Sequence, residues 1–311
     1  MRKREPHFVK KSPALAVALL VVSLFILSGC FGSSSTAKSK NGPDLESMSA
    51  QELEKKGDEA ARSGKEREAL VYYASAMDKG ADKSLVNYKI GGMFMGKEEW
   101  KKALAAYKAA VAAQNEFPAA LYGAGYASFM LEDNGAAEAY LKKALEFAPG
   151  MVPSASLLGV VYNKDGKPGE AIPVLEQALK VTPDNPELLN NLGIAKFMAG
   201  DFEGAAEAFQ ASLKVTDATR TRNNLGLALC GLRRYDEAFA AFTAAGSEAS
   251  ALNNLGACYE RAGDAQKARE YYEKAVEANP RFYIKASENL TRLNAGQPPA
   301  PHPEAGAPVG N

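Results

Sequence analysis

Cysteine and histidine are the residues of this chain most able to do chemistry, and the 311-residue sequence holds few of them. The three cysteines are Cys30, Cys230 and Cys258, and the two histidines are His7 and His302. Both histidines lie in terminal segments that we expect to be cleaved or unfolded, which excludes a histidine base, relay or metal ligand inside the fold. No G-x-S-x-G nucleophile motif is present either, so an envelope hydrolase is the least favoured class of function.

Cys30 stands at the end of a segment typical of exported proteins. Residues 1–13 are rich in Lys and Arg, and residues 14–27 are almost entirely apolar, as in a secretory signal. Fourteen apolar residues reach only about 21 Å, which is short of a hydrocarbon core of about 30 Å, so a permanent span is disfavoured. An ordinary signal peptide or an uncleaved anchor remains the alternative.

The four residues Leu27-Ser28-Gly29-Cys30 resemble the lipobox of bacterial lipoproteins. The resemblance implies that residues 1–29 are removed and that the Cys30 thiol carries diacylglycerol, with a further N-acyl chain such as palmitate. No other cofactor is expected. Because Phe31 follows the cysteine in place of an aspartate, the resemblance favours the periplasmic face of the outer membrane. Two or three acyl chains would hold the protein stably on the membrane.

The charge balance argues against nucleic acid as a partner. The chain has 37 Lys and Arg residues and 37 Asp and Glu residues, so it lacks the positive excess that phosphate backbones require. Residues 33–49 are too poor in apolar side chains to fold and are expected to form a tether with Cys30. The segment 295–311, which is rich in proline, is expected to be disordered.

Between these segments the sequence repeats about every 34 residues. Each repeat has a glycine, then an alanine twelve residues later, then a large apolar side chain four residues after that. The glycines are Gly57, Gly91, Gly125, Gly159, Gly193, Gly226 and Gly256. The alanines are Ala69, Ala103, Ala137, Ala171, Ala205, Ala238 and Ala268. These small residues would allow close contact between two helices, so they are structural.

This pattern resembles the tetratricopeptide repeat, with its leucine-glycine pair, A-x-x-x-F motif and closing proline. The resemblance implies an all-α, right-handed superhelical solenoid of seven helical hairpins over residues 50–282. The repeats start at Ala50, Ser84, Pro118, Val152, Pro186, Thr219 and Ala249. A capping helix over 283–294 would cover the last repeat with Tyr283, Ile284, Ala286, Leu290 and Leu293. Glu98, Glu132 and Arg233 replace a turn glycine, so those three turns are expected to be less regular.

The resemblance also implies which residues line the concave face that binds a partner. An apolar, aromatic and methionine-rich groove would bind an amphipathic helix or a hydrophobic segment of a protein. The alternative is that several of these residues pack between hairpins as core. The groove residues are Leu85, Tyr88, Met95, Tyr122, Tyr126, Phe129, Met130, Ile194, Phe197 and Met198.

Three asparagines, Asn190, Asn223 and Asn253, lie at the same place in successive repeats. They could bond the main chain of an extended peptide, or they could bond between adjacent helices. The Lys and Arg clamp with which related proteins hold a terminal carboxylate is not apparent, because Glu54 and Asp58 of the first repeat would repel one.

Cys230 and Cys258 fall at different places of neighbouring repeats. Adjacent helices pack about 8 to 10 Å apart, whereas a disulfide needs Cα atoms within about 7 Å. We therefore expect two small buried thiols, with a disulfide as the less favoured alternative.

Together these features predict a non-enzymatic, lipid-anchored scaffold whose partners are proteins. Lipidated cysteine, tether and compact repeat array resemble the assembly factors of pili and secretion machines, above all the Tad/Flp pilus lipoprotein and the type IV pilus pilotin. A scaffold for exopolysaccharide export or for cell-wall enzymes is the alternative, because repeats of this kind specify a fold and not a partner.

Overall fold

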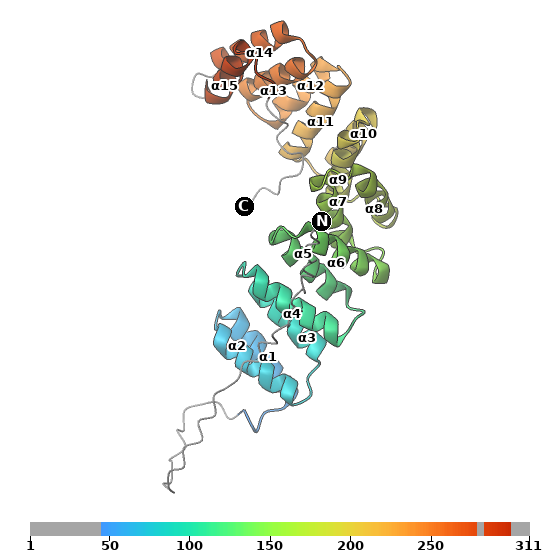
Figure 1. The fold of residues 1–311 in the computed structure, drawn as a ribbon, viewed down its shortest axis with the longest axis vertical. Helices are drawn as coiled ribbons and strands as arrows, with labels where there is room; N and C mark the ends of the chain where they lie inside the picture. The colour runs from blue at the N-terminus through green and yellow to red at the C-terminus, as the bar shows by residue number, and fades with distance from the viewer. Residues whose placement is uncertain (1–44, 279–282, 300–311) are drawn as a thin grey trace, which may run out of the picture. The chain divides into compact units, whose positions relative to one another are not determined.

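The computed structural model describes residues 45–278 and 283–299 and shows only helices there (Figure 1). The expected signal peptide, Cys30 and most of the tether lie outside the described residues, as do residues 279–282 at the end of the last repeat and 300–311 of the tail. The all-α solenoid of tandem hairpins is confirmed.

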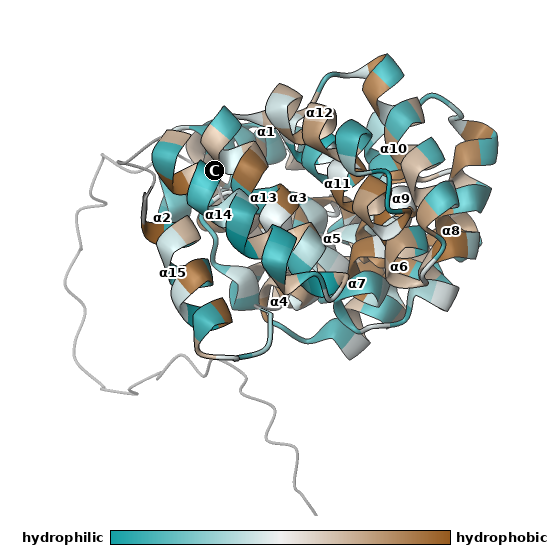
Figure 2. Ribbon diagram, turned by 90° about the horizontal axis from the view of Figure 1, so that it is seen from above, coloured by the Kyte–Doolittle hydropathy of each residue, from teal (hydrophilic) through white to brown (hydrophobic). Residues whose placement is uncertain are grey.

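Fifteen helices occupy the described part of the chain, two in each of seven hairpins and one at the end. The first helices of the hairpins are α1 Ala50–Arg62, α3 Lys83–Met95, α5 Pro118–Met130, α7 Val152–Lys164, α9 Pro186–Met198, α11 Thr219–Gly231 and α13 Glu248–Arg261. The second helices are α2 Glu66–Asp78, α4 Trp100–Ala113, α6 Asn134–Phe147, α8 Pro168–Val181, α10 Phe202–Val215, α12 Tyr235–Ala245 and α14 Ala265–Ala278. The last helix is α15 Tyr283–Asn294. Hydrophobic and hydrophilic residues alternate around the helices (Figure 2), as expected when one stripe of each helix faces its neighbours.

Tyr107 shows how the repeated glycines build the core. Its ring, in α4, lies against Gly91 of its own hairpin and Gly123 of the next one. A Cβ atom would come within 2.7 Å of the ring at Gly91 and within 2.5 Å at Gly123, closer than real Cβ atoms approach. The absence of both side chains lets a ring that is only 2% exposed fill the space between two hairpins.

The turns at Glu98, Glu132 and Arg233 correct one expectation. Their φ angles of 58°, 61° and 60° are left-handed, close to the 68° of Gly166, so these turns have the same conformation as the glycine turns. The reason is the hydrogen bond that closes the helix, in which the residue after the turn donates to the carbonyl five residues back. This bond measures 3.0 Å from the Glu99 N–H to the Phe94 oxygen, 3.0 Å from Asp133 to Ser128 and 2.9 Å from Arg234 to Leu229, against 2.8 Å from Lys167 to Tyr162.

The end of the array is held by the capping helix α15. Arg292 of α15 binds Glu260 of α13 through two hydrogen bonds of 2.5 and 2.6 Å, and the Tyr272 hydroxyl of α14 donates to the same carboxylate at 2.8 Å. Ala286 is buried, but Ile284 is 70% exposed, so the expectation that Ile284 covers the array is wrong. The helix does present Ala286, Leu290 and Leu293 to its neighbours, as expected, together with the charged Arg292.

Candidate partner-binding surface

An aromatic cluster in the second and third hairpins contains several of the residues expected in the groove. Tyr88 of α3 packs against Phe117, with ring centroids 5.1 Å apart, and against Tyr107 at 5.8 Å. Tyr126 of α5 packs against Tyr122 at 6.2 Å and against Trp100 of α4 at 6.0 Å. These separations are those of favourable aromatic pairs. We call these six rings the aromatic cluster.

Two phenols of the cluster, those of Tyr107 and Tyr122, have a raised pKa. Burial raises the pKa of Tyr107, and the neighbouring phenols of Tyr88 and Tyr122 raise it further. Burial likewise raises the pKa of Tyr122. Tyr88, Tyr122 and Tyr126 are each half-buried, so each keeps part of its ring accessible. A surface of rings that carry hydroxyl groups can take an apolar side chain and still donate a hydrogen bond.

Exposed apolar side chains lie in the same helices as the cluster. Leu85 of α3 is 39% exposed and Met130 of α5 is 38% exposed. Met95 is half-buried, and its sulfur accepts a weak hydrogen bond from the Tyr107 hydroxyl at 4.0 Å. In the fifth hairpin, Met198 is 40% exposed at the end of α9. Flexible side chains of this kind adapt to different apolar partners.

Phe129 and Ile194 do not belong to an accessible surface, and their assignment to the groove is wrong. Phe129 is 7% exposed and packs in a core cluster with Leu141 and Leu158 from two hairpins, while Ile194 is 2% exposed and packs against Phe209. Both stand in hairpins that have a neighbour on each side. Their side chains therefore fill the contact between hairpins, which is the alternative the sequence left open.

Asn190 and Asn253 of the asparagine row bond between adjacent helices. The Asn190 side-chain oxygen accepts hydrogen bonds from Thr221 at 3.2 Å and from Asn224 at 3.3 Å, both in the next hairpin. The Asn253 oxygen accepts one from Asn289 of the capping helix at 2.9 Å. Asn223 is half-buried. The interhelical role therefore accounts for two members of the row.

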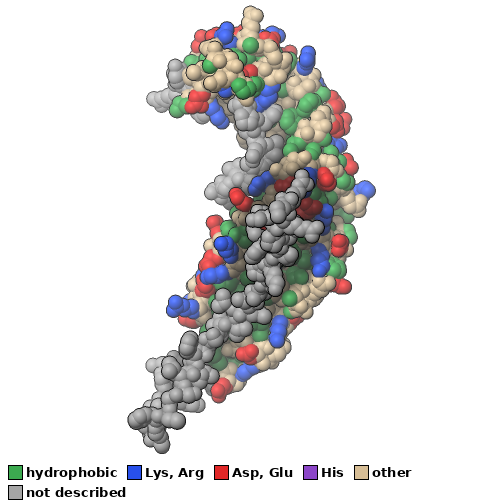
Figure 3. Space-filling view, viewed as in Figure 1, with side chains coloured by type: hydrophobic (Ala, Val, Ile, Leu, Met, Phe, Trp, Pro, Cys, Tyr) green, Lys and Arg blue, Asp and Glu red, His purple; other side chains and the backbone are tan. Residues whose placement is uncertain are grey.

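The first hairpin carries the two acids that argued against a carboxylate clamp, and both bind one lysine. The Lys89 ammonium of α3 lies 2.6 Å from Glu54 and 2.8 Å from Asp58, and the Tyr73 hydroxyl donates to Asp58 at 2.8 Å. Two carboxylates share one cation, so this group of three charged side chains is negative as a whole. Over the face drawn in Figure 3, basic and acidic side chains are mixed among hydrophobic ones.

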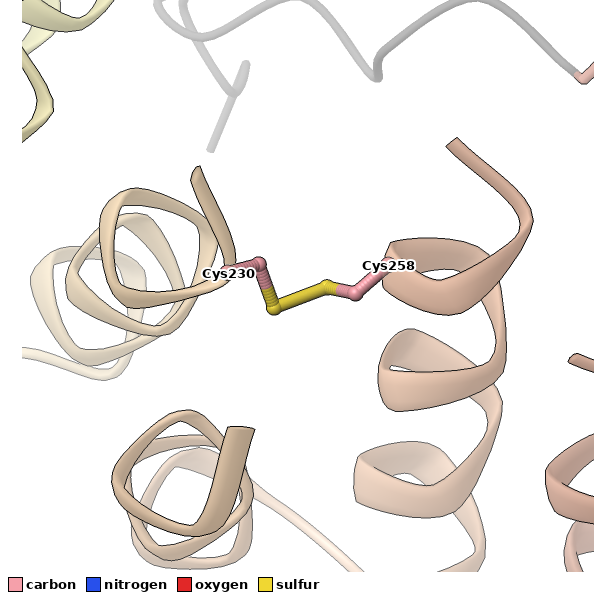
Figure 4. Close-up of a disulfide and its surroundings, with 2 residues drawn as sticks. All are labelled: Cys230 and Cys258. Carbon is pink, nitrogen blue, oxygen red and sulfur yellow. A yellow bond between two sulfur atoms is a disulfide. The ribbon is translucent and has the colours of Figure 1, made fainter. Parts of the chain in front are cut away.

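Cys230 and Cys258 form a disulfide, which overturns the expectation of two free thiols (Figure 4). Their Cα atoms lie 5.7 Å apart, and the bridge joins α11 to α13. The expectation failed because it compared helix axes. Facing Cα atoms lie closer than the axes by two helix radii of about 2.3 Å each. The sixth repeat is also short, with 11 residues in α12. Residues with the same position number in the sixth and seventh repeats therefore need not lie at the same level along their helices.

Residues 45–278 and 283–299 contain neither a membrane-spanning helix nor a cluster of metal ligands. No helix among them is long and apolar enough to cross a bilayer. No group of three or more His, Cys, Asp or Glu side chains among them is arranged to hold a metal ion.

Many solved structures share this fold, and three of them cover most of this chain. A tetratricopeptide repeat protein from Parabacteroides merdae ATCC 43184 has a TM-score of 0.55 at 15% identity, with 79% of this chain and 98% of that chain covered. PilW, described as a widely conserved type IV pilus biogenesis factor, has a TM-score of 0.54 at 19% identity, with coverage of 66% and 97%. The anaphase-promoting-complex assembly of Cut9 and Hcn1 has a TM-score of 0.52 at 19% identity, with coverage of 76% and 48%.

Family comparisons cover nearly all of the repeat array. The tetratricopeptide repeat family matches residues 249–282. The family described as the cilia and flagella-associated protein 70 C-terminal domain matches residues 30–253, which is more than two thirds of the chain. The chain therefore belongs to this family of tetratricopeptide-repeat domains, whose fold is a scaffold for protein interactions.

Proposed function

We propose that this protein is a lipid-anchored scaffold on the periplasmic face of the outer membrane that binds an apolar segment of a pilus or secretion-machine component. The observation that carries the binding role is the aromatic cluster, in which the half-buried rings of Tyr88, Tyr122 and Tyr126 share helices α3 and α5 with the exposed side chains of Leu85 and Met130. Rigid rings next to flexible apolar side chains suit a hydrophobic or amphipathic helix.

Two observations on the cysteines support the lipid anchor and the periplasmic location. The lipobox-like segment before Cys30 supports lipidation and export. The disulfide between Cys230 and Cys258 supports export independently, because disulfides persist in oxidising compartments such as the periplasm and are rare in the cytosol. The fold shared with PilW is what favours pilus assembly over the other machines of the envelope.

Trp100 makes the binding role directly measurable. It is the only tryptophan of the chain, and its ring lies 6.0 Å from that of Tyr126. The probe is a tryptophan-free model helix of about 18 residues with leucine on one face and lysine on the other. Binding in the aromatic cluster should shift Trp100 emission to shorter wavelength in a saturable manner.

The variant Tyr126→Ala should weaken binding of the model helix by about 30-fold, the effect of losing about 2 kcal/mol from an aromatic anchor. The matched control is Phe147→Ala, since Phe147 is also an accessible ring, 37% exposed, but stands outside the cluster. A destabilised Tyr126→Ala protein with undiminished affinity would show that Tyr126 serves the core, and the proposed binding role would fall.

The anchor has its own test. Intact-mass spectrometry of the membrane fraction should show the mature chain with acyl groups, and Cys30→Ser should remove them and leave the protein soluble or as the unprocessed precursor. A Cys30→Ser protein of mature size that stays in the membrane fraction would refute lipid anchoring without affecting the binding role.

A further inference from the structure

A cavity of about 270 Å³ lies beside the disulfide, outside the aromatic cluster. It is bounded by the ends of α9, α11 and α13 and by the starts of α10 and α12. The residues that matter for its chemistry are Phe202, Tyr235, Arg233, Arg261 and the two bridged cysteines. The volume is below the range of pockets that hold drug-sized ligands, about 300 to 1,000 Å³, and it suits one large side chain.

The walls of the cavity are apolar and already fixed in place. The Phe202 ring packs on Phe197 with centroids 5.4 Å apart and lies over Gly231, where a Cβ atom would come 2.6 Å from the ring. Tyr235 stacks on Tyr259 at 4.2 Å, and Tyr259 is itself stacked on a third tyrosine. With the disulfide as another wall, little ordering remains to be done when a side chain enters.

Two arginines supply the charge of the cavity, and neither forms an ion pair with any residue that the structure describes. In contrast, Arg222, Arg234 and Arg292 each bind a carboxylate. Glu260 precedes Arg261, but both of its oxygens accept hydrogen bonds from Arg292. No Asp or Glu from the described residues lines the cavity.

Arg261 is half-buried, so part of its hydration is lost, and among the described residues no carboxylate forms an ion pair with it in return. Burial lowers the pKa of its guanidinium; Tyr272 and Glu260 act to raise that pKa and the like charge of Arg292 acts to lower it, and the effect of burial prevails. A carboxylate brought to the cavity would replace the lost hydration by charge-assisted hydrogen bonds.

Arg233 occupies a backbone position that disfavours a side chain. Its φ of 60° is left-handed, and the corresponding turns before and after it contain Gly200 and Gly263 at 83°. Retaining an arginine there costs stability, and such outliers point to function. Glu98 and Glu132 occupy the same turn elsewhere, so it is the guanidinium beside the cavity that distinguishes Arg233.

We propose that this cavity binds an acidic segment of a protein partner, with one large apolar side chain in the cavity and an adjacent Asp or Glu carboxylate on Arg233 and Arg261. Charge complementarity selects the acidic residue, since the cavity offers two guanidinium groups and no acid. The apolar walls favour a peptide over a phosphate compound, because a phosphate has no group to fill them. This site is separate from the aromatic cluster and does not depend on the lipid anchor.

The probe for this site is a fluorescein-labelled peptide, acetyl-Ser-Gly-Asp-Phe-Asp-Gly-Ser-amide, titrated with the full chain in detergent and read by polarisation. It should bind at least about tenfold more tightly than a peptide in which both Asp are replaced by Asn, because that peptide loses a charge-assisted hydrogen bond. It should exceed a peptide in which Phe is replaced by Gly by a similar factor, because that peptide buries no ring. Arg261→Gln should reduce binding by a similar factor. The control Arg67→Gln makes the same charge change on exposed α2 and should leave binding unchanged.

A second variant guards against misfolding. Arg233→Gly relieves the strain of the left-handed backbone, so it should raise the unfolding midpoint and yet weaken binding of the peptide. Damage to the fold cannot produce this combination. Equal affinity for the Asp and Asn peptides, or unchanged binding by both arginine variants, would overturn the proposal. Displacement of the peptide by inorganic phosphate together with indifference to the Phe-to-Gly change would also overturn it, by showing a simple anion site.

Discussion

Removing the disulfide between α11 and α13 should destabilise the last part of the array by a predictable amount. The bridge spans 28 residues of sequence. In the chain-entropy treatment, closing a loop of this size in the unfolded chain removes about 3.5 kcal/mol of conformational freedom at 25 °C. The double variant Cys230→Ala, Cys258→Ala should therefore lose at least that amount, because Cys258 is only 4% exposed and removal of its buried sulfur adds a loss of packing.

The loss should be local, because stacked repeats depend mainly on their nearest neighbours. Hydrogen exchange of the oxidised protein and the double variant should show faster opening in α11 to α15 and unchanged protection in α1 to α6. Wild type treated with reductant is the matched comparison, since it has the same side chains without the bridge.

Thiol titration under denaturing conditions must accompany the exchange measurement, since it counts the cysteines that are free before reduction. A bridge that is present by titration, but whose removal leaves exchange in α11 to α15 unaltered, would refute the entropic reasoning. Free thiols at Cys230 and Cys258 in the exported protein would refute the bridge itself.

Three further changes test the packing, the turns and the end of the array. Ala171→Leu should lower the free energy of unfolding by about 1 to 3 kcal/mol in denaturant titration, because Ala171 is fully buried in a helix contact. Glu98→Gly should raise it by about 1 kcal/mol, since the φ of 58° suits glycine. Burial acts to raise the pKa of Glu260, but hydrogen bonds from Arg292 and Tyr272 outweigh it and hold that pKa below the usual 4.5. This carboxylate therefore stabilises the fold above about pH 4.5, and in a thermal melt series its contribution should disappear as the pH falls through the lowered pKa and be absent in Glu260→Gln.

The sequence was informative where one residue type has one physical role. Glycine recurs opposite a ring, as Gly91 does opposite Tyr107, because any Cβ atom there would collide with the ring. The spacing of these glycines along the sequence therefore marks the hairpins. Five of the seven first helices begin at the expected repeat starts, and the other two, α3 and α13, begin one residue earlier. Proline at the first turn of α5 and α9 explains such agreement, because its fixed φ suits the start of a helix.

The surface was harder to predict because it depends on contacts between hairpins. Phe129 has the right place in its repeat to face a groove, but α7 covers it from the next hairpin. Trp100 had no signal in the repeat pattern, and it joins the aromatic cluster only because α5 brings Tyr126 to it. Arg261 lies in an ordinary helix end, and nothing in the sequence shows that its nearest acid is already bound by Arg292.

The disulfide, the cavity and the shortest repeat coincide, and one cause connects them. Helix α12 has 11 residues where the other second helices have 13 or 14, so the sixth hairpin offers less apolar surface to its neighbours. The cavity lies beside the bridge, at the ends of α11 and α13, and space in a protein interior costs stability. A covalent bridge beside that space offsets the loss without filling it. The bridge thus allows an open cavity to persist inside a packed array, which a binding site requires and a well-filled core would not permit.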